Sequence, residues 1–329
     1  MVLDDLIDDG RCESEEIFGL CVNTGIAFSN HKGVYKKGVE KRQRKLLENI
    51  GYIKPFLDDG EQILLVTNGS SPMSLLEQLF TGSIIYYLKR SHFIFTNKRI
   101  FHVPVKLPIF FLSPMGRYRD SISQILYSDC EFIKQKGRTL KVKYKSGKKE
   151  SFYHIEGKEK KKAKVLLQSV SLAGKPSVFE RRMHLCPRCQ GMLIQNHFEC
   201  PHCELLFKSK KEAMKISVWC PGGGYFYTRH PVLGVFDAIS EAFIMFAICV
   251  NAVDALKGFE GAVAGIVIFG IALIIEKIGT ISHSNHFLKE FIPVDKDVVP
   301  FVRESQSQIS PLDVVDELDE FAEAVDYDE

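Results

Sequence analysis

The sequence predicts an α+β protein of several domains, and three observations support this fold class. A series of short alternating segments between residues 55 and 172 predicts a β-rich domain that ends in a helix. Two Cys-x-x-Cys pairs follow it, and two long apolar runs come after them. With 329 residues, the chain has room for more than one domain. We therefore expect a small β-barrel, a compact cysteine-rich module and a helical hairpin, in that order.

Residues 1–54 are expected to form an N-terminal extension that carries one helix. Within it, residues 1–40 lack clear periodicity, and we expect them to be loosely structured. Over residues 40–56, apolar side chains recur at helical spacing among lysines and arginines. Because proline cannot continue a helix interior, Pro55 is expected to end this helix. The first domain boundary is therefore placed between residues 54 and 55.

Residues 55–172 are expected to form a barrel of strands in series, capped by a helix over residues 159–171. Tight turns are expected at residues 96–99 and 146–149, and Asn97 is able to adopt the positive φ that such turns use. The expected strands begin near Glu61, Ser83, Ser91, Ser121, Cys130, Thr139 and Glu150.

Two motifs in this region resemble the bacterial PH-like and GRAM-like domains. Gly60-Glu61 opens an apolar strand, as in those domains. Residues 95–100 read Phe-Thr-Asn-Lys-Arg-Ile, close to their Leu-Thr-Asn-Lys-Arg-Leu hairpin. The resemblance covers residues 55–172, about a third of the chain. It implies a binding module without catalytic activity, often found beside transmembrane helices, and it implies no particular ligand.

Four cysteines give the clearest chemical signal in the sequence. They are Cys186, Cys189, Cys200 and Cys203. Ten residues separate the two Cys-x-x-Cys pairs, a spacing that can direct four thiolates at one tetrahedral ion. Zinc favours such a set, and four protein ligands leave no position for water or substrate. We therefore expect a structural zinc ribbon over residues 182–208, with another metal or an iron–sulfur cluster as the alternative.

Two apolar runs are expected to form a transmembrane helical hairpin over residues 230–280. Residues 232–253 and 261–275 each approach the roughly 20 residues that cross a bilayer. Gly261 and Gly265 form a Gly-x-x-x-Gly motif, which permits close contact between helices. Because both runs are short or interrupted, two buried core helices of a soluble protein are the alternative.

Two acidic residues, Asp237 and Glu241, interrupt the first apolar run. They are one helical turn apart and therefore share a face. We expect them to lie near the membrane interface or to face the second helix. Since carboxylates inside a membrane often mark ion pathways, a small transport or conductance component that uses these two residues is an alternative function.

Residues 220–227 read Cys-Pro-Gly-Gly-Gly-Tyr-Phe-Tyr and precede the first apolar run. They resemble the Pro-Gly-x-Gly-x-x-Tyr lead-in of small two-span bacterial membrane modules. The glycines would let the chain turn tightly as it meets the membrane, and the aromatic residues suit the headgroup level. A plain glycine-rich loop is the alternative.

The placement of charge predicts the orientation of the hairpin. Basic residues precede its first helix, whereas the connecting loop holds one lysine against two acids. By the positive-inside rule, we expect the residue 55–172 domain, the zinc ribbon and the C-terminus to lie in the cytoplasm. Together with the resemblance to bacterial PH-like domains, this implies the bacterial inner membrane. The start of the chain shows no cleavable signal peptide, and a reducing cytoplasm suits thiolate ligands.

A net charge of +2 conceals a lysine-rich segment and an acidic tail. Alternate lysines project from one face of an expected strand and continue around its turn. These are Lys141, Lys143, Lys145, Lys148 and Lys149. They could contact anionic lipid headgroups or a protein, or form only the solvated face of the barrel. Residues 305–329 are expected to hold an acidic amphipathic helix that docks on a partner or on this basic face, with a frayed tail as the alternative.

The sequence contains no phosphate-binding loop, no His-Glu-x-x-His motif, no nucleophile elbow and no dinucleotide fingerprint. We therefore expect a membrane-anchored adaptor that is not an enzyme and that binds lipid headgroups or a protein partner at the cytoplasmic face. A homo-oligomer is compatible with this role. A soluble zinc-ribbon protein that binds nucleic acid is the remaining alternative, which the few aromatic residues around the ribbon disfavour.

Overall fold

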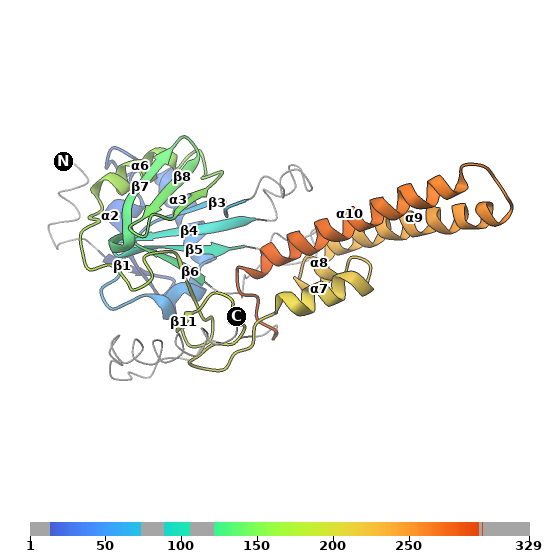
Figure 1. The fold of residues 1–329 in the computed structure, drawn as a ribbon. Coiled ribbons are helices and arrows are strands. Elements are labelled where there is room, and N and C mark those ends of the chain that lie inside the picture. Colours follow the sequence, from blue (N-terminus) through green and yellow to red (C-terminus); the bar gives the residue numbers. More distant parts are fainter. Residues whose placement is uncertain (1–13, 74–88, 106–121, 296–297, 299–329) are drawn as a thin grey trace.

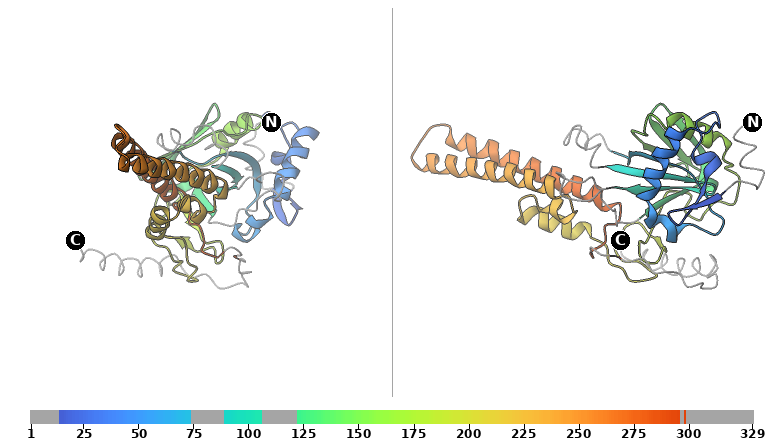
Figure 2. Two further views of the ribbon diagram at one scale, coloured as in Figure 1. Left: turned by 90° about the vertical axis from the view of Figure 1, so that its right-hand side faces the viewer. Right: turned by 180° about the vertical axis from the view of Figure 1, so that it is seen from behind.

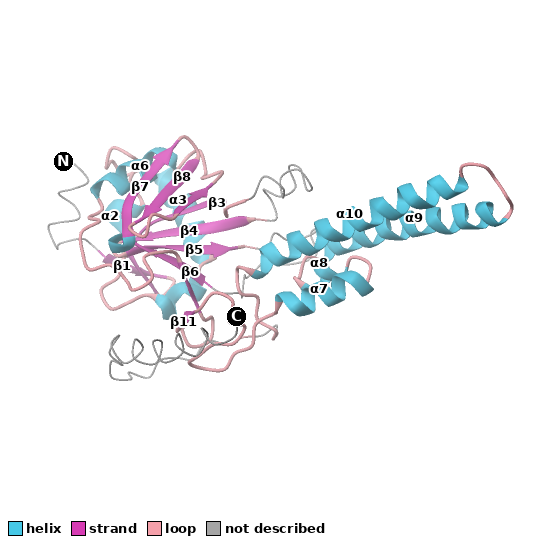
Figure 3. Cartoon of the chain, viewed as in Figure 1, coloured by secondary structure: helices cyan, strands magenta, loops and turns pink. Residues whose placement is uncertain are grey.

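The computed structural model describes residues 14–73, 89–105, 122–295 and 298. In this part of the chain, two long helices project from the side of a mixed α+β body (Figure 1, Figure 3). The two views of Figure 2 show the helices running together away from the sheets. The strand expected near Ser83 and the acidic helix expected within residues 305–329 lie outside the described residues.

An eight-stranded sheet forms the centre of the body, in the order β1-β2-β3-β4-β5-β6-β10-β11. Its middle strands are antiparallel and almost wholly buried. They are β3 (Ile63–Ser70), β4 (Arg90–Thr96), β5 (Arg99–Pro104) and β6 (Ile122–Leu126). Because both faces of these strands are covered, burial is nearly continuous along each strand, and it includes polar side chains such as Ser91, Thr96 and His102.

A second sheet of three antiparallel strands follows. It consists of β7 (Cys130–Lys136), β8 (Thr139–Tyr144) and β9 (Lys149–Phe152). Its inward side chains, those of the main sheet and those of helix α6 (Lys160–Ser169) share one hydrophobic core. Local alternation and turn residues therefore predicted these elements correctly, because each strand of this sheet pairs with the strand next to it in the sequence.

The expected closed barrel is not confirmed. The two sheets meet at a corner, where Ser70, the last residue of β3, and Tyr153, directly after β9, form an isolated bridge. At the other side, β6 pairs with β10 (Met183–Leu185) of the cysteine-rich segment, and the short turn at Tyr127–Asp129 leads into β7. A partner strand from later in the sequence thus occupies the edge that a closed barrel would use.

The expectation of loose structure for residues 1–40 is wrong for the described residues from 14 onward. Strands β1 (Ser14–Ile17) and β2 (Leu20–Asn23) form a hairpin, and β2 runs parallel to β3. The hairpin turns at Phe18-Gly19, where both residues have positive φ, as two-residue hairpin turns require. Strands of four residues are too short to show a period, so the sequence pattern missed them.

Helix α3 (Lys37–Glu48) confirms the expected amphipathic helix, but it ends before Pro55. The chain continues as a 3-10 helix over Gly51–Phe56 that contains this proline. The side-chain amide of Gln43 holds α3 against β3: it donates to the carbonyl of Val66 at 2.9 Å and accepts from its N–H at 3.0 Å. A polar side chain in this core position is stable because its hydrogen bonds are satisfied.

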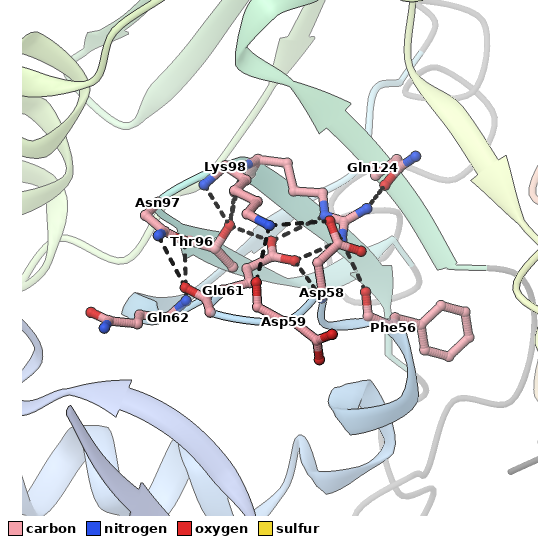
Figure 4. A network of polar contacts seen from close by, with 11 residues as sticks. Phe56, Asp58, Asp59, Glu61, Gln62, Thr96, Asn97, Lys98 and Gln124 are labelled. Atoms are coloured by element: carbon pink, nitrogen blue, oxygen red, sulfur yellow. Dashed lines mark hydrogen bonds and ion pairs between the residues drawn. The ribbon is translucent and has the colours of Figure 1, made fainter. Parts of the chain in front are cut away.

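A buried ion pair joins the residues that carry the resemblance to PH-like domains (Figure 4). Arg99 donates from Nε and Nη2 to the two carboxylate oxygens of Glu61, at 3.0 and 2.6 Å. Thr96 also donates to Glu61, and Arg99 reaches the carbonyl of Phe56. Asn97 forms part of the expected turn but has no positive φ. The Gly-Glu and Thr-Asn-Lys-Arg motifs therefore lock β3 to the β4–β5 turn.

Helices α9 (Pro231–Leu256) and α10 (Ala262–Leu288) form the expected hairpin, and both are long and apolar enough to cross a membrane. Only 11% of the apolar window of each helix is buried, so the alternative of a buried soluble core does not fit the described chain. Of the two glycines in the Gly-x-x-x-Gly motif, Gly265 makes the close contact, because a Cβ there would lie 2.0 Å from Oδ1 of Asn251. Together these features indicate that the protein associates with a membrane.

Candidate functional site

The four cysteines predicted to bind zinc converge on one point. Their sulfur atoms all lie within 4.8 Å of one another. The Sγ atoms of Cys186 and Cys203 are 3.6 Å apart, and those of Cys189 and Cys200 are 3.5 Å apart. Sulfurs at 2.3 Å from a tetrahedral ion are about 3.8 Å apart, whereas a disulfide brings them to about 2 Å. The arrangement therefore fits a single metal ion and excludes a disulfide.

The two Cys-x-x-Cys pairs share the same local backbone. The carbonyl of Cys186 accepts from the N–H of Gln190 at 3.0 Å, and that of Cys200 accepts from Glu204 at 2.9 Å. Gln190 and Glu204 both adopt positive φ, 66° and 55°. These matching turns direct the thiols of each pair to the same side, so the sequence spacing produces the cluster by local folding.

A metal bound here would have a structural role. Four thiolates fill a tetrahedral shell and leave no position for a reacting water. The hydrophobic core around the cluster is small and includes Leu193, Phe207 and Phe291. Small modules with so little apolar burial usually depend on a metal for their stability.

The cysteine-rich segment is joined on both sides to the rest of the protein. Strand β10 extends the main sheet by pairing with β6 and continues into β11 (Met192–Leu193). After α10, the chain returns to the cysteine-rich segment, where Lys208 N–H donates to Ile292 O at 2.8 Å and Val294 N–H donates to Leu206 O at 2.9 Å. The cysteine-rich segment therefore lies between the sheet and the base of the hairpin and contacts both through backbone hydrogen bonds.

Arg182, directly before β10, connects these parts a second time. Its guanidinium lies 3.4 Å from Glu150 of β9 and 3.4 Å from Glu290, which follows α10. It also donates to Nδ1 of the buried His102 on β5, at 3.2 Å. Burial opposes the ionisation of Glu290, but the adjacent Arg182 holds the pKa of this carboxyl well below its ordinary value. The buried ion pairs of Arg182 with Glu150 and Glu290 thus connect the base of the hairpin to the sheet.

A cavity of about 240 Å³ lies beside this network. Its basic residues are Lys148, Arg181, Arg182 and Lys289. The acidic lining residues are Glu150, which pairs with Arg182 and Lys148, and Glu290, which pairs with Arg182. Four basic side chains against two acidic ones leave an excess of positive charge. This cavity suits a small anionic group, and it borders the end of α10.

The five lysines predicted to bind lipid or a partner differ in their surroundings. Lys141 is exposed on β8 while its neighbours Leu140 and Val142 are buried, which confirms the alternation. Lys143 pairs with Glu131 on the adjacent strand. Lys145 and Lys149 are exposed around the β8–β9 turn. Of the five, Lys148 lines the cavity.

Asp237 and Glu241 both face the second helix, as expected. Thr280 donates to Asp237 at 3.0 Å, and Lys277 forms an ion pair with Glu241 at 2.6 Å. Glu276 of α10 completes a group of three carboxylates whose oxygens lie within 4.8 Å of one another. A carboxylate directly after the second apolar run is visible in the sequence. Only the structure shows that Glu276 lies beside Asp237 and Glu241.

No family model matches the chain, and neither a curated protein nor a solved structure matches it. The assignment of function therefore depends on the geometry described above.

Loss of one cysteine ligand should remove the metal. We expect the Cys200→Ser variant to lose the roughly one metal ion that four thiolates can bind per chain, as measured by elemental analysis of the purified protein. Without the ion, protease cleavage within residues 186–207 should become faster. Cys220→Ser is the matched control, because Cys220 is exposed and lies outside the cluster. Retention of a full metal content by Cys200→Ser would contradict the assignment.

The buried His102 should make the stability of the sheet depend on pH. Burial, supported by the nearby Arg182, lowers the pKa of His102 to about 3 from its ordinary value of 6.5. Between these values the unfolded chain binds a proton that the folded protein does not, so stability falls as the pH decreases below about 6.5. The slope attributable to this one group is about 1.4 kcal/mol per pH unit.

Thermal unfolding of the detergent-solubilised protein, followed by circular dichroism between pH 7 and about 4, measures this dependence. The His102→Gln variant serves as the comparison. A pH dependence as steep in this variant as in the unchanged protein would show that His102 is not responsible.

Proposed function

We propose that the protein is a membrane-anchored adaptor without catalytic activity. In this proposal, α9 and α10 cross the bacterial inner membrane, and the sheet domain binds an anionic headgroup at the cytoplasmic face. The ribbon holds a structural zinc ion and fixes the sheet domain to the hairpin.

The observation that carries the proposal is the continuous connection from sheet to ribbon to hairpin base. Backbone pairing joins β6 to β10, and the return of the chain at Ile292 joins the ribbon to the end of α10. The Arg182 ion pairs connect the same three parts. An anchor built in this way holds the sheet domain in a defined position at the membrane, unlike a flexible linker.

Two further features support the finer assignments. Among the described residues, strands β3 to β9 follow one another and are succeeded by α6, and strands in series before one helix are what the resemblance to PH-like domains implies. A set of four cysteine ligands favours zinc over harder cations, and the expected reducing cytoplasm keeps these thiols available.

The cavity beside Arg182 is the best candidate for the headgroup site. Lys148, Arg181 and Lys289 line it, and Lys289 directly follows the membrane helix α10. A cavity at this place would open close to the membrane surface, where phosphate-bearing headgroups are abundant. Basic side chains near an anionic surface contribute about 1 kcal/mol each.

A transport or conductance role remains the second candidate, because three carboxylates meet between the helices. In this role, Asp237→Asn and Glu241→Gln would abolish ion flux across proteoliposomes. In the adaptor role, the same variants would leave the anchoring of the chain intact.

Membrane anchoring is tested by fractionation. We expect the full chain to stay in the membrane pellet after carbonate extraction and to be released by detergent, because the exposed apolar faces of α9 and α10 require lipid. Protease added to spheroplasts should leave the sheet domain intact, whereas protease added to inverted vesicles should digest it. A chain that carbonate releases would refute the anchor, and the opposite protease pattern would refute the orientation.

A further inference from the structure

The segment before the hairpin forms two short helices that lie along its lower part. Helix α7 (Lys210–Trp219) points in the same direction as the hairpin, and α8 (Gly223–Tyr227) returns toward α9 (Figure 1). Lys277 of α10 donates to the carbonyl of Ser217 at 2.6 Å, which places the end of α7 beside that level of the hairpin. The chain therefore turns back beside the hairpin before the first long helix begins.

Polarity changes along α7. Its first turn carries Lys210, Lys211 and Glu212, and Lys215 is the last charged residue of the helix. Its last turns expose apolar side chains, and Trp219 at the end is 86% exposed. Exposed apolar side chains that lie together on one surface often mark a contact with a membrane or with another protein. The neighbouring outer faces of α9 and α10 are apolar and exposed as well, so the surface at Trp219 continues the surface for which we propose a lipid partner.

The turn between α7 and α8 is internally satisfied by hydrogen bonds. The N–H of Cys220 donates to Ile216 O at 2.9 Å, and that of Gly223 donates to Cys220 O at 2.9 Å. The N–H of Gly222 points at the carboxylate of Glu241, 3.4 Å away. Irregular backbone at membrane depth is stable only when its polar groups have partners within the protein.

Glu241 of α9 and Lys277 of α10 form an ion pair that also contacts the α7–α8 segment. Glu241 is 1% exposed, and it pairs with Lys277 while it faces the N–H of Gly222. Lys277 in turn donates to one carbonyl in the last turn of α7, that of Ser217. Because each charge has both an ionic partner and a backbone partner, the pair holds the α7–α8 turn against the hairpin.

Close packing of this turn requires glycine. A Cβ at Gly222 would lie 2.0 Å from Gly234 O of α9, and one at Gly224 would lie 2.2 Å from the hydroxyl of Ser217. Gly222 also has a φ of 66°, which other residues rarely adopt. The run of three glycines therefore fixes α7 and α8 tightly on the hairpin instead of acting as a plain flexible loop.

Helix length places this turn inside a bilayer. From Ala262 to Lys277 the helix rises about 22 Å, at about 1.5 Å per residue. If the hydrocarbon layer begins at the tip of the hairpin, near Ala262, its thickness of about 30 Å exceeds this rise of about 22 Å. Lys277 then lies inside the layer. The level of Ser217 and Gly222, which contact Lys277 and its partner, then lies within the layer.

We propose that α7 and α8 form a re-entrant membrane element: the end of α7 inserts into the near leaflet of the lipid bilayer, and the Glu241–Lys277 pair braces it from the hairpin side. The inference rests on the proposed membrane anchor and adds a third lipid contact to it. The first turn of α7, with Lys210 and Lys211, lies at the headgroup level, where basic side chains are favourable on an anionic leaflet.

Trp219 is the single tryptophan of the chain and therefore reports on this element without any substitution. The test reconstitutes the full protein in phosphatidylcholine vesicles and measures its fluorescence. We expect the emission of Trp219 to be blue-shifted. Lipids brominated on the acyl chain should quench it several-fold more strongly than aqueous iodide. Among these lipids, those with bromine near the headgroup end of the acyl chain should have the strongest effect. Strong iodide quenching with no effect of brominated lipid would overturn the proposal.

A second variant separates this inference from the anchor itself. In Trp219→Phe/Phe246→Trp, the single tryptophan moves to an exposed position on α9. Quenching of the new tryptophan by brominated lipid, together with an unquenched Trp219 in the unchanged protein, would leave the anchor standing and reject the re-entrant element. Absence of lipid quenching at both positions would reject both.

Discussion

Arg182 makes the contact on which the arrangement of the whole protein depends. Its guanidinium joins β9 through Glu150, the end of α10 through Glu290, and β5 through His102. These elements come from distant parts of the chain, and the ribbon strand β10 begins at the next residue. A buried arginine is costly to desolvate, so it persists where its partners fix a unique geometry. Here that geometry sets the position of the sheet domain relative to the hairpin.

The same principle recurs at two other junctions. Arg99 and Glu61 lock the β4–β5 turn to β3, and Lys277 and Glu241 link the α7–α8 turn to the hairpin. In each case, charged side chains are buried at a joint between elements rather than at an open site. Charge pairs of this kind contribute little net stability compared with apolar packing, but the loss of one partner is expensive, so they specify one arrangement over others. In the Gly-Glu and Thr-Asn-Lys-Arg motifs, Glu61 and Arg99 therefore bind each other and join two segments of the sheet domain.

Local patterns predicted the elements whose evidence is local. The alternation over β7 to β9, the turn at residues 96–99, the two cysteine pairs and the apolar hairpin all depend on residues close together in sequence, and the structure contains each of them. The sequence could not show that β10 would pair with β6 and occupy the barrel edge, because that contact joins distant segments. The β1–β2 hairpin was missed since its strands are short, and Glu276 was missed because two helices must pack before it meets Asp237.

The central claim is that one buried arginine couples the sheet, the ribbon and the hairpin base, and hydrogen–deuterium exchange of the Arg182→Met protein in detergent tests it most directly. The account predicts faster amide exchange in β9, in β10 and in the residues around Glu290, with β3 unchanged. Arg181→Met is the matched control, because Arg181 is the adjacent arginine and stacks on Phe179 outside the ion network. Faster exchange limited to β10 in the Arg182 variant would contradict the account, because the three parts would then be held together independently of this residue.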